Sequence, residues 1–193
     1  AAVLLMLLIS FVRSLAVAHL FTVAAIVTAL GTSVAMPVTT GQVTILLSVD
    51  AVTHFYWALI LLVSLVVSVL SSSYVASAES LREEWFLLLL LATVGAMVLS
   101  ASDHVGSLFI GLELMSVPLY GLAAYSLSNP RSLEAGIKYL VLSAVASAFL
   151  LFGMALIYAD TGILTLAGWG ERASAMSPLV ILGAGMILVG LGF

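Results

Sequence analysis

The sequence has no cysteine, few charges and only one lysine. Without cysteine the chain can form no disulfide, ligate no iron–sulfur cluster and use no catalytic thiol. Its histidines, His19, His54 and His104, are scattered, and none lies four residues from another, the spacing at which two histidines of one helix share a metal ion. Five Lys and Arg residues against nine Asp and Glu give a net charge of −4, which argues against a nucleic-acid partner.

Apolar residues take the place of the missing charges. They make up 64% of the chain and charged residues 7%, whereas soluble domains average roughly 45–50% and about 25%. The apolar residues come in successive blocks of about 20, each long enough to cross about 30 Å of hydrocarbon as a helix. We therefore predict an all-α integral membrane protein, a polytopic helix bundle in the lipid bilayer.

Polar punctuation between the apolar blocks predicts about seven transmembrane helices in one domain, residues 1–193. We expect a first helix truncated at the N-terminus and a seventh cut at the C-terminus, as in a fragment of a larger fold. The expected ranges are up to about 12, then 15–35, 51–75, 84–101, 104–127, 131–159 and 176 onward. The stretch 43–49 reads as weakly extended.

Arginine positions predict how the helices are oriented. Arg13, Arg82 and Arg131 fall in alternate connections, on one side of the membrane, and only Arg172 falls on the other. Because Lys and Arg are enriched on the cytoplasmic side, we expect the first three there. Asp50 is expected to cap the third helix, and Asn129 with Pro130 fits the start of the sixth.

Glu113 is an acid within an apolar helix. It lies about ten residues into the fifth predicted helix, close to the bilayer midplane, where an ionised side chain costs roughly 2.5–3.5 kcal/mol. Ser116 and Tyr120 lie at helical spacing from it, and Pro118 should kink the helix one turn away. We expect this face to meet protein or water. The alternative is a protonated glutamate that only bonds a neighbouring helix.

Lys138 is the second charge within a span. It lies about 12 Å into the sixth helix, and Glu134 one turn earlier offers an ion pair. Ser143 and Ser147 belong to a stripe of small residues that should let the fifth and sixth helices pack closely. Burial would bring an acid and a base in adjacent helices into a range for proton exchange. The alternative is a snorkelling anchor paired with Glu134.

A resemblance rests on these same residues. The segment GLELMSVPLYGLAAYSLSNPRSLEAGIKYLVLSAVASAFLLFGMALIYADTG closely resembles subunit N of the proton-translocating NADH-quinone oxidoreductase, respiratory complex I, and its antiporter-like relatives. Its most specific parts are Glu113 before an L-x-S-x-P turn and the R-S-x-E-A-x-x-K-Y opening of the next helix. Leu112, where sister subunits tend to carry tryptophan, favours subunit N.

The resemblance implies a fourteen-helix subunit of inverted repeats that couples NADH-to-quinone electron transfer to proton transport through buried Glu and Lys charges. Glu113 matches the fifth-helix glutamate of the family and Lys138 a sixth-helix lysine; a seventh-helix lysine is expected just after Phe193. No cofactor is expected on this chain, because quinone, FMN and iron–sulfur clusters would lie in partner subunits. Its partners would be the other membrane-arm subunits of complex I, in a bacterial inner membrane.

Two other functions stay open. A subunit of a multi-subunit sodium/proton antiporter would share the fold, and a purely structural scaffold of the membrane arm would use these charges for packing. A self-contained enzyme is disfavoured, because the glycines of GAGMILVGLG lie in an apolar helix without the preceding strand of a dinucleotide loop.

Overall fold

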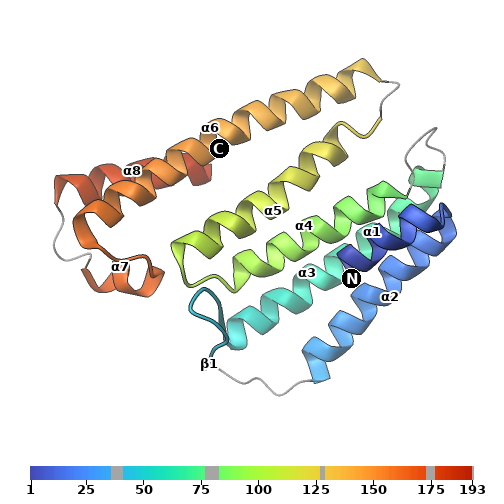
Figure 1. The fold of residues 1–193 in the computed structure, drawn as a ribbon, viewed down its shortest axis with the longest axis horizontal. Helices are drawn as coiled ribbons and strands as arrows, with labels where there is room; N and C mark the ends of the chain where they lie inside the picture. The colour runs from blue at the N-terminus through green and yellow to red at the C-terminus, as the bar shows by residue number, and fades with distance from the viewer. Residues whose placement is uncertain (36–40, 77–82, 127–128, 173–176, 193) are drawn as a thin grey trace.

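The computed structural model describes residues 1–35, 41–76, 83–126, 129–172 and 177–192. Apart from one short hairpin, their regular structure is helical (Figure 1). The helices are α1 (Ala2–Phe11), α2 (Leu15–Ala35), α3 (Ala51–Ala76), α4 (Glu84–Ser100), α5 (Val105–Ala123), α6 (Pro130–Thr161), α7 (Leu166–Arg172) and α8 (Pro178–Gly192). The hairpin pairs β1 (Gly41–Gln42) with β2 (Ser48–Val49) in antiparallel register.

The observed helices confirm the predicted all-α membrane fold. Four of them, α2, α3, α5 and α6, are long and apolar enough to cross a membrane, while α1, α4 and α8 are apolar but shorter. These seven correspond to the seven expected spans. The two helix starts predicted from capping residues, at Asp50 and at Asn129 with Pro130, are also confirmed. Asp50 accepts hydrogen bonds at Oδ1 from the backbone N–H and the hydroxyl of Thr53, at 2.7 and 2.8 Å. Asn129 caps α6, with Pro130 as the first helical residue.

The six helices from α1 to α6 run up and down, so that the bundle has two ends (Figure 1). We call the end with the α1–α2 turn and the start of α6 the arginine end, because Arg13 and Arg131 lie there. The other end, with α7, is called the α7 end. The backbone of Arg172 closes α7, so it lies opposite Arg13 and Arg131, as the sequence predicts. Arg82 falls outside the described residues.

The buried apolar side chains form two clusters. One joins α1, α2, α3 and α4 and includes Ile26, Leu61 and Phe86. The other joins α5, α6, α7 and α8 around Leu150 and Met154. Between the clusters, α4 and α5 pack backbone to backbone: a Cβ on Gly111 would lie 2.7 Å from the backbone nitrogen of Leu99. Glu113 lies on the side of α5 that belongs to the second cluster.

The α7 end is closed by a network of loop hydrogen bonds. The hairpin bridges to the α4–α5 connection at Leu47 and Ser102, and that connection bridges to the segment before α7 at His104 and Thr165. The extended stretch expected at 43–49 is therefore only partly correct, since regular strand covers Ser48–Val49 alone. Helix α7 was not predicted: it has seven residues, too few for a membrane span.

Candidate functional site

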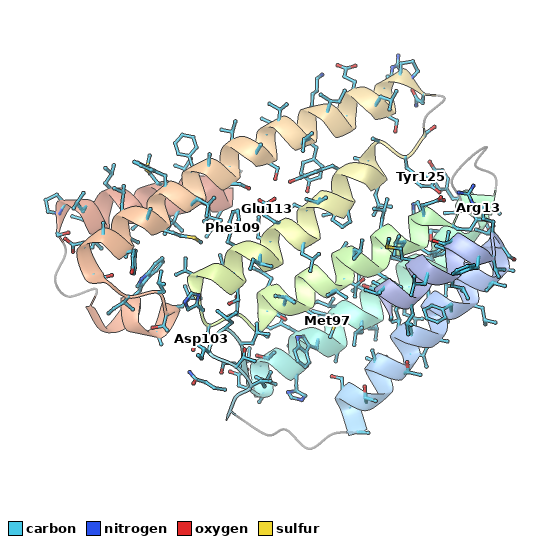
Figure 2. All side chains as sticks on the ribbon, viewed as in Figure 1. Arg13, Met97, Asp103, Phe109, Glu113 and Tyr125 are labelled. Atoms are coloured by element: carbon cyan, nitrogen blue, oxygen red, sulfur yellow. The ribbon has the colours of Figure 1, made fainter. Side chains whose placement is uncertain are left out.

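Glu113 lies at the middle of α5 and contacts α6. It is the ninth of nineteen residues in the helix, so about 13 Å of helix extends on either side of it. Figure 2 shows Glu113 on the face of α5 that is turned toward α6. There the hydroxyl of Ser147 donates a hydrogen bond to Glu113 Oε1. Ser147 lies close to the midpoint of α6, so both helices place this contact near the midplane of the membrane.

A second polar contact joins the same two helices. The hydroxyl of Tyr120, seven residues after Glu113, bonds the hydroxyl of Ser143. The Tyr120 ring also meets Tyr139 edge to face, with centroids 4.9 Å apart. Close approach is possible because Gly136 faces Ala124: a Cβ on Gly136 would lie 2.5 Å from the Ala124 Cβ. The predicted packing of α5 against α6 is confirmed.

The remaining neighbours of Glu113 divide between protein and the outer surface of the chain. Ser116 is buried and Phe109 packs in the second cluster, whereas Ile110 and Val117 are exposed. Of the expected contact with protein or water, the structure shows contact with protein on the α6 side of this face. Pro118 lies inside α5 without ending the helix. Sequence reasoning included Ser147 and Ser143 only as small packing residues, although their hydroxyls at i, i+4 spacing were a readable signal.

Lys138 lies on the outer surface of α6. Its Nζ forms an ion pair with Glu134 Oε1 at 2.5 Å, and the two side chains are 70% and 60% exposed. The sequence analysis named this i, i+4 pair as one of the options for Lys138. Among the described residues, it is the arrangement that the structure contains.

The structure does not bring Lys138 to Glu113. Ser147, the partner of Glu113, lies nine residues after Lys138 on α6, so the two charges differ by about 13 Å in height. Lys138 is instead near the level at which α5 ends, since its neighbour Tyr139 packs on Tyr120. At such a distance two unit charges interact by only about 1 kcal/mol at an effective dielectric constant of 20. Direct proton exchange between them is excluded in this conformation.

Polar groups also gather at the α7 end, between α3 and α4. A recess of about 530 Å³ there is lined by Asp50, Tyr56 and Asp103, together with backbone and serines of the α4–α5 connection. Asp50 caps α3 through its Oδ1, and its hydrogen bonds from Thr53, backbone first, hold its pKa below the usual 3.8. His104 caps α5, with Nδ1 accepting from the Gly106 N–H at 2.9 Å. The described residues contain no group of acids and histidines able to hold a metal ion.

These features define a class, a multi-pass membrane bundle with a glutamate held at mid-membrane depth between two helices. Comparison with known proteins shows which members of this class the chain resembles. Residues 102–193, which include Glu113 and Lys138, match the family of NADH:quinone oxidoreductase/Mrp antiporter transmembrane domains. This half of the chain is therefore similar in sequence to the transmembrane domains of that family.

Three solved structures share the fold over 99% of this chain. One is respiratory complex I from Thermus thermophilus with bound aureothin, at 32% identity and a TM-score of 0.83. Another is the membrane-bound sulfane sulfur reductase, an archaeal respiratory membrane complex, at 26% and 0.75. The Mrp complex from Dietzia sp. has a TM-score of 0.81 at 21% identity and shows the fold alone. The chain spans 41%, 42% and 38% of the respective matched chains.

Proposed function

We propose that the chain is part of a proton-translocating membrane-arm subunit, of the subunit N type, of a bacterial NADH-quinone oxidoreductase. Glu113 would be its proton carrier. The observation that carries the proposal is the placement of Glu113: a carboxyl group at mid-membrane, on the inner side of α5, with a hydroxyl donor from α6. The 32% identity to a complex I chain over 99% of this chain supports the same assignment.

The proposed mechanism is a change of charge at Glu113 that follows quinone reduction in partner subunits. A carboxyl group at this depth can change its charge only if its surroundings compensate, because an uncompensated charge costs roughly 2.5–3.5 kcal/mol. The Ser147 hydroxyl is one such partner, since it can donate to the ionised form. Moving a charge against the membrane potential takes about 2.3 kcal/mol per 100 mV. Interactions of the carrier must supply an energy of this size, and they are strong enough only where water does not screen the charge. Lys138 would act only as a distant charge that modulates Glu113.

Paired neutralisations test the proposal in the assembled, full-length complex. Glu113→Gln keeps the shape and a hydrogen-bonding group for Ser147 but removes the titrating proton. Proton pumping should fall by at least about tenfold, since a positioned proton-transfer group typically contributes 10²-fold or more. Glu134→Gln is the matched control, because that side chain is exposed and its charge pairs with Lys138 on the outer surface of α6. Equal, wild-type pumping in both variants would rule out the assignment.

The second candidate function is a subunit of a multi-subunit sodium/proton antiporter, which the fold shared with the Mrp complex favours. It predicts transport that depends on sodium and proceeds without NADH oxidation. Measurement of proton uptake into vesicles with and without sodium separates the two functions. A scaffold role predicts instead that Glu113→Gln lowers the amount of assembled complex and leaves pumping per complex unchanged.

A further inference from the structure

Polar side chains also occur in the core between α2, α3 and α4, away from Glu113. Thr22 and Ser68 are 0% exposed, and Ser64 and Thr93 are 7% and 5% exposed. Thr22 lies between Ala18 and Ile26 on one face of α2, and Ser64 and Ser68 follow Leu61 on one face of α3. Ala18, Ile26 and Leu61 all belong to the first apolar cluster. These hydroxyls therefore share one interior.

The positions of these side chains along their helices give the order in which they lie along the membrane normal. The Ser64 and Thr93 hydroxyls bond each other at 2.8 Å across α3 and α4. Ser68 lies one turn, about 6 Å, from this pair toward the arginine end. The ring of His19 stacks on Phe86, with centroids 5.0 Å apart, and Phe86 lies about 10 Å from Thr93 toward the same end.

The height of Thr22 along the membrane normal follows from the position of His19. It is three residues further along α2, about 4.5 Å back toward the midplane. Thr22 thus falls at the same height as Ser68. The order from the arginine end is therefore His19, then Thr22 with Ser68, then the pair of Ser64 and Thr93.

Two atoms of this series lack a hydrogen-bond partner among the described residues. They are His19 Nε2 and Ser68 Oγ, both buried at the atom level. Glu84 Oε2, at the first residue of α4 on the arginine end, is a third. A buried donor or acceptor is strongly disfavoured unless it finds a partner, and buried water is the usual partner at polar sites of this kind. Ser68 is the decisive residue, because no part of it reaches the surface.

We propose that His19, Thr22, Ser68 and the pair of Ser64 and Thr93 form a hydrated file that carries protons between the arginine end and the middle of the membrane. The file deepens the proposed function and rests on it, but it is separate from the contact of Glu113 with Ser147, which faces α6. Each step moves a proton and no electrons. His19 accepts a proton at one ring nitrogen and releases one from the other. Thr22 and Thr93 donate to the carbonyls of Ala18 and Leu89, at 2.8 and 2.7 Å, so their oxygens only accept hydrogen bonds from the file. Ser64, Ser68 and the waters of the file each accept one proton as they donate their own.

The glycine contact of α4 with α5 sets how far the file reaches. Gly95 packs against the backbone of Met115, and these residues lie two positions from Thr93 and Glu113 respectively. The file therefore ends within about 6 Å of the height of Glu113, on the other side of the α4–α5 contact. It supplies a route into the membrane core that the α5–α6 site alone does not contain.

Water in the file can be tested by cysteine reactivity, because residues 1–193 contain no native cysteine. The parent complex, treated in parallel, gives the signal of cysteines elsewhere, which is subtracted. In the full-length subunit within the assembled complex, Ser68→Cys is treated with a water-soluble methanethiosulfonate reagent. Leu61→Cys is the control, since Leu61 is 3% exposed on the same face of α3. Because the reaction requires a solvated thiolate, Ser68→Cys should react at least about tenfold faster. Equally slow modification of both positions would overturn the proposal.

A second experiment tests proton transfer itself. His19→Phe keeps an aromatic ring for stacking on Phe86 and removes the ring nitrogens. We expect the ratio of protons pumped to electrons transferred to drop at least threefold, with assembly intact. His54→Phe, in the first turn of α3 at the α7 end, where His54 is half-buried, should leave the ratio unchanged. A wild-type ratio in His19→Phe would overturn the proposal even if Glu113→Gln abolishes pumping; should His19→Phe fail to assemble, the cysteine result decides.

Discussion

Glu113 shows how a single side chain is fixed by its surroundings. Its place at mid-helix makes ionisation expensive, at roughly 2.5–3.5 kcal/mol on insertion scales. One hydrogen bond to a charged group returns about 1.5–3 kcal/mol, so the Ser147 hydroxyl offsets much of that cost by itself. A half-buried acid at mid-helix with an adjustable hydroxyl partner from α6 is the arrangement on which the proposed proton transfer rests.

Asp50 gives a pH prediction at the α7 end. Hydrogen bonds from the Thr53 backbone and hydroxyl hold its pKa below 3.8. A lowered folded-state pKa means that the cap contributes stability above the unfolded value and that this is lost as pH falls through the folded one. Amide exchange in the first turn of α3 should therefore speed up only below about pH 4. In Asp50→Asn, which still caps, the same measurement should show no such acid step; a step that persists would contradict the assignment.

Tyr125, at the arginine end, gives a pH prediction of the opposite sign: stability is lost as pH rises. Burial, followed by the nearby charges of Glu84 and Glu83, raises the pKa of Tyr125 to about 12. Because the unfolded chain loses the phenol proton first, at about 10, the fold loses stability as pH rises from about 10 to about 12. Ultraviolet titration of tyrosinate, with Tyr125→Phe as the subtraction, should show this late-titrating group. Glu84→Gln should lower the pKa of Tyr125 only part of the way toward 10, because burial remains; an unchanged titration would refute the contribution of the Glu84 charge.

Helix α6 carries both Ser147, which bonds Glu113, and the exposed ion pair of Lys138 with Glu134. Its 32 residues correspond to about 48 Å, longer than the hydrocarbon layer of about 30 Å. Because Ser147 marks the midplane, the ion pair of Lys138 with Glu134 lies near the edge of the hydrocarbon. Snorkelling is easy from there, which explains how both charges remain on the outer surface of the helix.

The packing of α8 on α6 gives a prediction at this scale. A Cβ on Gly183 would lie 2.7 Å from the carbonyl oxygen of Gly153, whereas a Cβ on Gly185 meets nothing within 4 Å. Gly183→Val should force α8 away from α6 and destabilise the bundle by about 1–3 kcal/mol, the usual cost of overpacking. Gly185→Val, the same change two residues along, should be nearly neutral. Thermal unfolding in detergent compares them, and equal midpoints would contradict this packing.

Helix positions could be read from the sequence because lipid sets the length of each apolar block and the caps are local. Asp50 and Asn129 are examples of caps whose signal lies within three residues. Helix α7 could not be read, because it is short and held by tertiary contacts, such as the bond from the Trp169 indole N–H to the carbonyl of Ile163. Pattern alone gave no reason to expect a helix there.

For the molecule as a whole, the sequence predicted the position of each charge along its helix better than the direction in which its side chain points. Glu113 was placed at mid-membrane, but α6 is apolar nearly all round, so its rotation about its axis could not be derived. That rotation decides that Ser147 faces Glu113 and Lys138 faces outward. The polar series of His19 and Ser68 depends likewise on how α2, α3 and α4 are turned toward one another. Such facts belong to packing between helices, and no single segment encodes them.

The central claim is that the carboxyl group of Glu113 changes its protonation during turnover. Infrared difference spectra of the full-length protein in its assembled complex, recorded between oxidised and reduced states, report carboxyl C=O stretching bands directly. We predict a band that disappears in Glu113→Gln and persists in Glu134→Gln. Difference spectra that are identical in wild type and Glu113→Gln throughout the carboxyl region would contradict the account.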